Sequence, residues 1–533
     1  MACQYSSLMG GNSRKIDSLI MIIRKLSKFF LSLLSCFYFC STSHAEDLLQ
    51  PAKIFSHNMV LQQGGEVPFW GKSNPNVKVT VEYAGQKKVT KADGNGKWSL
   101  NLEPMIAASN PNVLKVFTKS KEFRFNNVVV GEVWFSGGQS NMAYNAGGMA
   151  KHLELGKSLL DKADYPNIRF RRVNETNSSI PKEDLSGGSW FVCNKDSVKS
   201  FSAVGFIFSR RLHLELKIPI GVIDCSWGGT PIEPYIPSEA FKDHPTLDKL
   251  LSHAKARDFE SIKKMRGGTF VRSDAWLAGA IYNSRVSPVA PYAIRGFTWY
   301  QAESNCGTGE DPRDYAHKMR ALIRGWRKSW DNTNLPFYYV QLPQWHSYAW
   351  TYAREEQLRA LDEPKTGMVV TVDLDFNNDI HPPNKIDVGE RLALWPMKNE
   401  YNLSKPTSGP LFKSFEHKDE FIIVRFNHSK AGLMIGKSVV GDVLEDKGAK
   451  LFGFELADAH GVWHEAKASI ENDSIILDKS GIEEPRAVRY ACHPKAPKNK
   501  QWNLYNKSKL PASPFCSDWS LMKYDPTKNP MPK

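Results

Sequence analysis

The pattern of apolar and polar positions changes twice along the chain. In residues 46–128, short runs such as VPFWG, VKVTVEYAG and GKWSLNL alternate apolar and polar side chains, and Gly, Asn and Pro separate them. A period of two residues is typical of half-buried β-strands, and the separating residues favour tight turns. We therefore expect a small N-terminal domain that resembles a β-sandwich over residues 46–128.

A different pattern begins near residue 129. The nearly continuous apolar run VVVGEVWFSGG indicates a buried parallel strand. Helical stretches such as DYAHKMRALIRGWRKSW then alternate with strand-like ones such as IPIGVIDCSWGG, AIRGFTWYQAESN and LPFYYVQLP. Strands that alternate with helices predict a layered α/β domain around a parallel sheet, which we place at 129–402. Residues 403–533 return to short β-like runs and predict a C-terminal β-rich domain whose end, from Lys495 on, is mostly loop.

The N-terminus has the features of a secretory signal peptide. Lys25 and Lys28 precede the apolar run FFLSLLSCFYFC, and Ser43, His44 and Ala45 form a small-residue cleavage site. We expect residues 1–45 to be removed and the protein to be secreted, periplasmic or lysosomal. No later stretch is long and apolar enough to predict a membrane span.

The net charge and the motifs of the chain narrow the classes of binding partner that we expect. The net charge is +14, of which residues 1–45 contribute +4, so the remaining chain carries +10. A basic surface attracts sialic acids, uronic acids or sulfated glycans, although it can also lack a specific partner. The chain has no zinc-finger spacing, RNA-binding signature or long Lys/Arg run, so we expect no nucleic acid partner and no metal.

Five cysteines lie beyond residue 45, and export would permit disulfides. An odd count leaves at least one thiol free. The preferred bridge is Cys492–Cys516, within the loop-rich C-terminal region. Cys225 and Cys306, at the ends of two predicted strands, are the rival partners.

Candidate catalytic groups follow three of the predicted strands, at the sheet edge where α/β proteins bind ligands. In GGQSNM, two glycines permit a sharp turn that projects Ser140, whose hydroxyl is either a nucleophile or a helix N-cap. In CSWGGT, Gly228 and Gly229 offer backbone N–H donors or simply a tight turn. In WYQAESN, the Asn305 amide is either an oxyanion donor or the closing residue of a turn.

A fourth cluster, Asp379-Ile380-His381-Pro382, supplies an imidazole and a carboxylate that can orient it. Each cluster alone is a modest signal. Together they provide the nucleophile, base, acid and oxyanion donors that acyl transfer needs.

The blocks GEVWFSGGQSNM, SWGGTPIEPY, WYQAESN and DIHPPNK resemble, in this order, those of the sialate O-acetylesterase family, within the SGNH (GDSL-like) hydrolase superfamily. IFSHNMVLQQ and VRYACHPKAP extend the resemblance over residues 50–520. It implies a flavodoxin-like α/β/α catalytic domain, flanked by N- and C-terminal β-rich domains, and a serine esterase that needs no cofactor and acts on acetylated carbohydrate.

The resemblance also implies roles for individual residues. The catalytic residues would be Ser140, His381 and Asp379, the oxyanion hole would contain Ser140, Gly228, Gly229 and Asn305, and substrate would contact Gln139, Gln301 and Glu303.

Two departures from the family pattern affect these assignments. Ala302 stands where the family usually has Gly. The stretch Asp373-Leu374-Asp375-Phe376 has an Asp and a Phe where the family usually has Gly and Asp, which places Asp375 as an alternative orienting acid for His381. In addition, position 378, where many members of the superfamily carry the acid, is Asn378.

Three functions remain to be distinguished. The leading prediction is a carbohydrate acetylesterase, with sialic acids or plant or algal polysaccharides as alternative substrates. A glycan-binding protein without activity is the second. A lipase or peptidase is the third, but the chain has neither a long apolar lid nor the G-x-S-x-G elbow.

Overall fold

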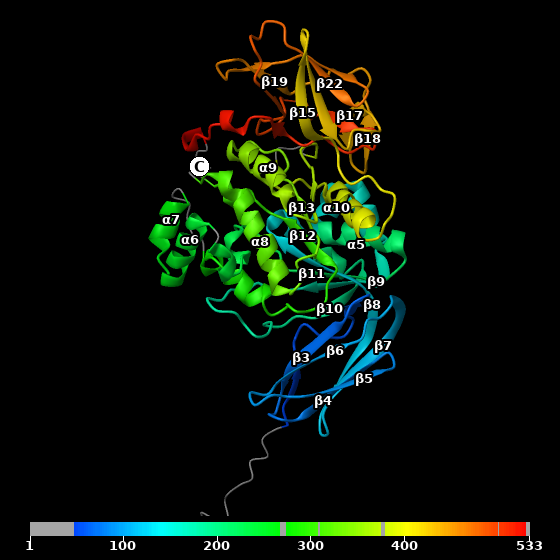
Figure 1. Cartoon of the computed structure of the whole chain (residues 1–533). Helices are drawn as coiled ribbons and strands as arrows, with labels where there is room; N and C mark the ends of the chain where they lie inside the picture. The colour runs from blue at the N-terminus through cyan, green and yellow to red at the C-terminus, as the bar shows by residue number, and fades with distance from the viewer. Residues whose placement is uncertain are drawn as a thin grey trace, which may run out of the picture.

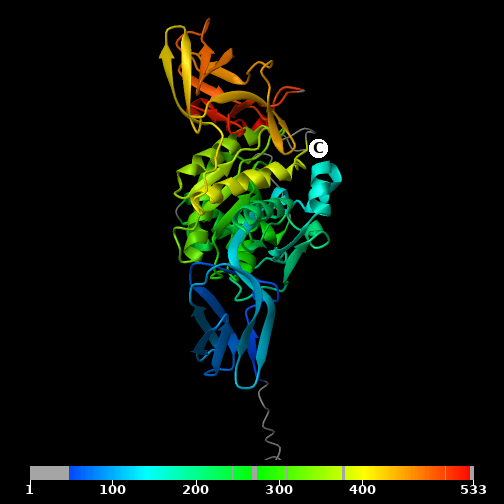
Figure 2. The ribbon, with the colours of Figure 1, turned by 90° about the vertical axis from the view of Figure 1, so that its right-hand side faces the viewer.

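The computed structural model describes residues 47–242, 244–266, 273–307, 310–374, 379–498 and 500–528. The predicted signal peptide lies outside the described residues. An N-terminal β unit, a central α/β unit and a C-terminal β unit follow one another along an elongated molecule (Figures 1 and 2).

The N-terminal unit contains a three-stranded sheet with the order β1-β3-β6 and one end of an 11-stranded sheet that continues into the central unit. In that end, β4 pairs with both β5 and β7, and β7 pairs with β8. Alternating residues of the strands are buried, such as Val79 and Val81 of β4, which gives the predicted period of two. The strands are β1 (Leu49–Pro51), β2 (Val60–Gln62), β3 (Val67–Ser73), β4 (Lys78–Tyr83), β5 (Gln86–Lys91), β6 (Lys97–Leu102) and β7 (Ala108–Phe117).

Strand β8 (Glu122–Gly138) links the first two units without a linker. Its first part pairs with β7, and its last part pairs in parallel with β11 and β12 in the central sheet. The predicted boundary at residues 128 and 129 therefore falls inside one continuous strand, which fixes the direction of the N-terminal unit relative to the central sheet.

In the central unit, the sheet has the strand order β10-β9-β11-β8-β12-β13-β14. It is a mixed sheet, because β10 is antiparallel to β9. The other neighbours are parallel, so their carboxyl ends share one edge, which faces the C-terminal unit (Figure 1). The strands are β9 (Asp164–Arg172), β10 (Trp190–Asn194), β11 (Ile220–Asp224), β12 (Gly296–Tyr300), β13 (Phe337–Val340) and β14 (Thr366–Val369).

Helices pack on both faces of this sheet. Successive residues of a strand point to opposite faces, and Trp134 of β8 packs against Phe208 of α5, whereas Phe135 packs against Trp326 of α8. The helices are α2 (Ser140–Ala143), α3 (Ala146–His152), α4 (Glu154–Asp161), α5 (Ala203–Leu216), α6 (Pro245–Ala256), α7 (Phe259–Met265), α8 (Tyr315–Ser329), α9 (Ala349–Arg359) and α10 (Lys385–Asn399).

The C-terminal unit contains three antiparallel sheets, with the orders β15-β16-β22-β21, β18-β17-β24 and β20-β19-β23-β25. The strands are β15 (Leu411–Lys418), β16 (Phe421–Asn427), β17 (Leu433–Val439), β18 (Asp442–Glu445), β19 (Phe454–Ala457), β20 (Trp463–Glu465), β21 (Ala468–Glu471), β22 (Ser474–Asp478), β23 (Ala487–Tyr490), β24 (Leu504–Asn506) and β25 (Phe515–Cys516).

The cysteines do not form the predicted bridge. Cys492 and Cys516 lie in one small apolar cluster, but both are free thiols. The Cys492 thiol donates to the Phe515 carbonyl and the Cys516 thiol to the Asp518 carbonyl, so the expectation of a Cys492–Cys516 disulfide is wrong. Neither Cys225 nor Cys306 forms a disulfide within the described residues. Within the described ranges, no helix combines the length and apolar character that crossing a bilayer requires.

Candidate active site

Ser140 is the first residue of α2, directly after the carboxyl end of β8. Gly138 makes the turn, with a φ of 135°, and a Cβ atom at this position would lie 2.1 Å from the Tyr300 carbonyl oxygen of β12. Only glycine fits both the backbone angle and this close approach. The glycine turn therefore presents the Ser140 side chain at the sheet edge, as the sequence predicts.

The structure brings Ser140 and His381 together across 241 residues of sequence. His381 Nε2 lies 2.7 Å from Ser140 Oγ, and both side chains are partly exposed. Ser140 is not the N-cap of α2, since Gln139 holds that position. A serine hydroxyl that is hydrogen-bonded to an imidazole and remains accessible is the pair that nucleophilic acyl transfer requires.

Asp379 contacts His381 through the backbone. Its Oδ1 accepts the His381 backbone N–H at 2.8 Å, which shapes the turn that carries the imidazole. Burial lowers the pKa of His381, and the charge of the Asp379 carboxylate opposes this change. The alternative acid, Asp375, lies outside the described residues.

Two backbone N–H groups near Ser140 are available to a ligand. A Cβ atom built on Gly228 would lie 3.6 Å from Ser140 Cβ, so the glycine turn after β11 lies directly beside the serine. Within the described part of the chain, no acceptor takes the N–H of Ser140 or of Gly228. Gly229 is the next residue of this turn and has a φ of 72°. The turn therefore brings Gly228 against Ser140.

Asn305 has a different environment from the one predicted for an oxyanion donor. It lies in the short turn Glu303–Asn305 after β12 and is only 1% exposed. Its amide nitrogen donates to both carboxylate oxygens of Glu233, at 3.0 and 3.1 Å, and to Glu310 at 3.3 Å. Its amide oxygen accepts from the Ile232 backbone and from Gln301. Both amide hydrogens are engaged, so this geometry favours a structural role.

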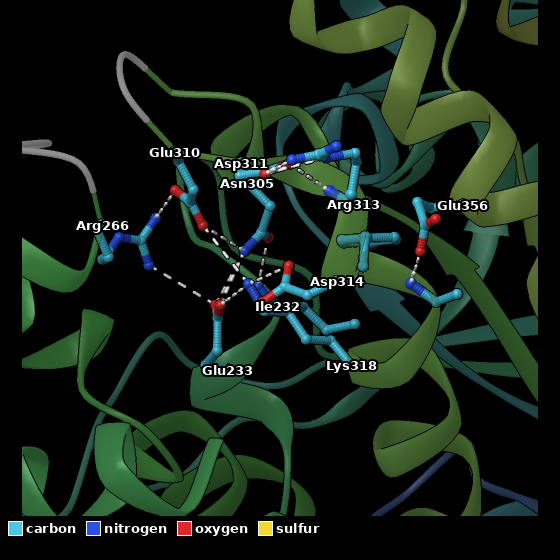
Figure 3. A network of polar contacts seen from close by, with 12 residues as sticks. Ile232, Glu233, Arg266, Asn305, Glu310, Asp311, Arg313, Asp314, Lys318 and Glu356 are labelled. Carbon is cyan, nitrogen blue, oxygen red and sulfur yellow. Dashed lines mark hydrogen bonds and ion pairs between the residues drawn. The ribbon is translucent and has the colours of Figure 1, made fainter. Parts of the chain in front are cut away.

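Asn305 belongs to a buried network of charged side chains (Figure 3). Lys318 Nζ lies 2.9 Å from Glu233 Oε1, and Arg266 pairs with Glu310 at 3.1 Å. Burial alone would raise the pKa of Glu233, but Lys318 and Arg266 outweigh it and hold the pKa at about 2. A buried carboxylate needs such partners to remain charged. The network therefore anchors the turns after β11 and β12 to each other.

The three predicted substrate-contacting side chains are buried behind Ser140. Gln301 donates to Gln139 Oε1 at 2.9 Å, and the Ser304 backbone donates to the same oxygen at 3.0 Å. Glu303 accepts from Asn141 at 2.5 Å. Gln139, Gln301 and Glu303 are 3%, 0% and 7% exposed, so their polar groups support the turns rather than face the substrate.

A buried clamp, formed by Asn141, Glu303 and Lys385, holds the histidine loop against the serine turn. Asn141 donates to Glu303 and, at 3.0 Å, to the Ile380 carbonyl, and it accepts from Lys385 Nζ at 2.6 Å. Lys385 Nζ also donates to the Pro382 carbonyl at 2.6 Å. The two carbonyls immediately before and after His381 are thus both tied to the clamp. The sequence reasoning missed this role, although Asn141 and Lys385 stand inside the GGQSNM and DIHPPNK blocks.

The clamp also affects the pKa of His381, the candidate base. Burial lowers the pKa of His381, the charge of Lys385 lowers it further, and Asp379 opposes both. Burial likewise lowers the pKa of Lys385, to about 7, against the opposing charges of Glu303 and Asp379. A lowered pKa keeps the imidazole neutral, and therefore able to accept a proton, at neutral pH.

Ala302 adopts the unusual backbone angle that its position suggests. Its φ is 154°, in a region where glycine is usual, and its side chain is fully buried. Its backbone N–H donates to Glu303 Oε2 at 3.0 Å. The methyl group is therefore accommodated without loss of the turn that carries Asn305.

Comparisons with known proteins agree with this geometry. Residues 249–395 match a family model described as a carbohydrate esterase, sialic acid-specific acetylesterase. The sialate O-acetylesterase of Rattus norvegicus is 28% identical, over 87% of this chain and 93% of that one. The human sialate O-acetylesterase is 27% identical, over 87% of this chain and 91% of that one.

A solved structure is similar to this chain over most of the length of both proteins. A carbohydrate acetylesterase from Xanthomonas citri superposes with a TM-score of 0.76 and 29% sequence identity, over 89% of this chain and 99% of that one. With the serine–histidine pair, these similarities define the protein as a carboxylic ester hydrolase. The chain is similar to sialate O-acetylesterases and to a carbohydrate acetylesterase, which confirms the resemblance predicted from the sequence blocks.

We expect Asn305→Ala to lower stability more than catalysis. The substitution removes donors from buried Glu233, which should lower the free energy of unfolding by about 1–3 kcal/mol, while kcat should fall by less than about tenfold. Denaturant unfolding and steady-state kinetics measure the two effects, and Asn334→Ala, at an exposed position, is the control. A kcat loss of about 10²–10³ with unchanged stability would instead identify Asn305 as an oxyanion donor.

We expect Lys385→Met to move the acidic limb of the pH–rate profile to higher pH. The positive charge of Lys385 lowers the pKa of His381, so its removal raises that pKa, and the imidazole then becomes neutral only at higher pH. The loss of the clamp should also reduce kcat. Profiles of kcat/KM against pH test this, with Lys398→Met at the exposed end of α10 as control. An unshifted acidic limb would contradict the electrostatic role.

Proposed function

We propose that the protein is an exported serine esterase that removes O-acetyl groups from carbohydrate through an acetyl-enzyme intermediate. The observation that carries this proposal is the 2.7 Å contact between Ser140 Oγ and His381 Nε2. The similarity to sialate O-acetylesterases and to a carbohydrate acetylesterase supports the choice of substrate class. We also propose that the central unit is a flavodoxin-like SGNH hydrolase domain with a β-rich domain on each side.

In the first half of the reaction, Ser140 Oγ attacks the acetyl carbonyl carbon while its proton passes to His381 Nε2. The carbonyl oxygen becomes an oxyanion, which the backbone N–H groups of Ser140 and Gly228 would bind, because neither group has an acceptor among the described residues. His381 then gives the proton to the sugar oxygen. The carbon–oxygen bond to the sugar breaks, and the acetyl group remains on Ser140.

In the second half, water replaces the sugar. His381 accepts a proton from the water as it attacks the acetyl carbon, and the same two N–H groups bind the second oxyanion. The bond to Ser140 Oγ breaks, the serine recovers its proton from His381, and acetate leaves. Every proton transfer in this cycle uses the single imidazole that the clamp positions.

A glycan-binding protein without activity is the alternative reading. An intact and partly exposed serine–histidine contact favours the enzyme, because pure binding would not require it. Sialic acids and acetylated plant or algal polysaccharides are both consistent with the acetylesterase proposal. Release of acetate from O-acetylated sialic acid, xylan and pectin would rank these substrates.

Ser140→Ala should abolish esterase activity on 4-nitrophenyl acetate without changing the fold. Loss of the nucleophile in such hydrolases costs on the order of 10⁴-fold or more in kcat. The control is Ser109→Ala, at an exposed position of β7. Circular dichroism checks the fold, and an organophosphonate probe should label Ser140. A Ser140→Ala protein that keeps a substantial part of the activity would exclude the proposal.

We also propose that Asp379 orients His381 and stabilises its protonated form. In Asp379→Asn, the remaining side-chain oxygen can still accept the His381 backbone N–H, so the change isolates the charge from the turn. We expect kcat to fall at least about 10²-fold and Asp375→Asn to have little effect. The reverse result would identify Asp375 as the acid, and two silent variants would indicate a Ser–His dyad.

A further inference from the structure

The C-terminal unit contains a pocket of about 920 Å³ that five lysines line, and Gln344 of the central unit is also among its lining residues. We call it the lysine basin. Its lining includes one acidic side chain, Asp446, and the amides of Gln344, Gln501 and Asn503. The lysines are Lys437, Lys450, Lys495, Lys498 and Lys500, and all five are exposed.

Most of the basin lysines have no carboxylate partner among the described residues that would neutralise their charge. Within the described ranges, Lys437, Lys450 and Lys498 form no ion pair with a carboxylate. Nearby lysines of the same unit behave differently: Lys507 pairs with Glu445 at 2.6 Å, and Lys509 pairs with Asp442 at 2.7 Å. Like charges that gather without counter-charges repel one another, and a bound anion would relieve that repulsion.

Gln344 connects the basin to the sheet edge that carries the candidate active site. Gln344 follows the carboxyl end of β13, just as Ser140 follows that of β8, and these strands run parallel on either side of β12. The C-terminal unit lies beyond this edge (Figure 1). Gln344 Oε1 accepts the Ala496 backbone N–H at 2.8 Å, so the lysine-bearing loop is fixed directly to the central unit.

The walls of the basin suit a sugar chain as well as an anion. Phe452 lies among the lining residues, with Lys500 Nζ 5.0 Å from the centre of its ring. Phe452 packs in turn against Trp502, with ring centres 5.5 Å apart. Side-chain amides beside an aromatic surface provide hydrogen bonds to hydroxyl groups and contact with the apolar faces of sugar rings.

We propose that the lysine basin binds polysaccharide that carries carboxylate or sulfate groups, and that it holds such a chain while one of its acetyl groups reaches Ser140. The second part rests on the proposed function, whereas binding itself does not. Lysine ammonium groups at exposed positions attract anions over distances of about 10 Å at moderate ionic strength. The protein should accordingly prefer acidic acetylated glycans to neutral ones, and the preference should weaken as salt is added.

Binding can be tested on the full-length protein with the substitution Ser140→Ala, so that no turnover occurs. The probes are polygalacturonate, which is carboxylated, dextran sulfate, which is sulfated, and unmodified dextran, which is neutral. The basin variant combines Lys437→Gln, Lys450→Gln and Lys498→Gln. The control variant combines Lys78→Gln, Lys119→Gln and Lys157→Gln, which removes the same charge from exposed lysines of other units. Isothermal titration gives each affinity.

We expect at least one acidic polymer to bind the parent and the control variant similarly, and to bind the basin variant at least tenfold more weakly. Unmodified dextran should bind none of them measurably. The polymer that loses more affinity identifies carboxylate or sulfate as the preferred group. An unchanged thermal unfolding midpoint in the basin variant would show that the loss is local.

Three outcomes would overturn the inference. They are equal affinity of the basin and control variants for the acidic polymers, equal binding of unmodified dextran, and tighter binding of a single-stranded oligonucleotide than of either glycan. Because the parent is inactive, these results do not depend on esterase activity. If wild-type protein fails to hydrolyse 4-nitrophenyl acetate while the basin binds acidic polymers as expected, the proposed function is wrong but the inference that the basin binds acidic glycans is supported.

Discussion

The buried contact between Lys385 Nζ and Asn141 Oδ1 is the interaction on which the contact between Ser140 and His381 depends. Asn141 follows Ser140 directly, and Lys385 begins the helix that follows the histidine loop. Because the same two side chains also bind the carbonyls on either side of His381, the imidazole and the serine hydroxyl are held in one geometry. Glu303 completes the clamp with a nearby buried carboxyl group. Burial makes such a network costly unless every group is paired, so it specifies one arrangement of the two loops.

The central sheet determines the positions of the turns that this clamp joins. Parallel strands bring the turns after β8, β11 and β12 to one edge, where the serine, the Gly228 N–H and the buried supporting side chains meet. Strand β8 continues from the N-terminal unit into the centre of the sheet, so Ser140 directly follows a strand whose last part pairs with β11 on one side and β12 on the other. A rigid scaffold of this kind limits the freedom of the reacting groups, which is what precise acyl transfer requires.

The second buried network, around Glu233 and Lys318, has a related structural role. It connects the turn after β11 to α8 and to the turn that contains Asn305. Three carboxyl groups and two cations share this region, and the opposing charges keep Glu233 ionised in spite of burial. The backbone N–H groups of Ser140 and Gly228, which have no acceptor within the described ranges, are consequently better candidates for oxyanion donors than the Asn305 amide.

The sequence by itself determined the order of the three units, the strand-end position of Ser140, the importance of its glycine turn and the relation to sialate O-acetylesterases. These features are local: a period of two, an apolar run and a pair of glycines are visible in neighbouring residues. Even the positive φ of Ala302 follows from a position where glycine is usual.

Only the tertiary structure decided which side chains face the substrate and which support the site. Gln139, Gln301 and Glu303 belong to the same sequence blocks as Ser140, yet they are buried. The partners of Asn305 and Asn141 lie 72 and 244 residues away, at Glu233 and Lys385. Cys492 and Cys516 share one cluster, but each thiol has a backbone acceptor instead of a bridge. Sequence spacing cannot determine such contacts, because packing against distant elements decides where a polar side chain points and whether it meets solvent or a buried partner.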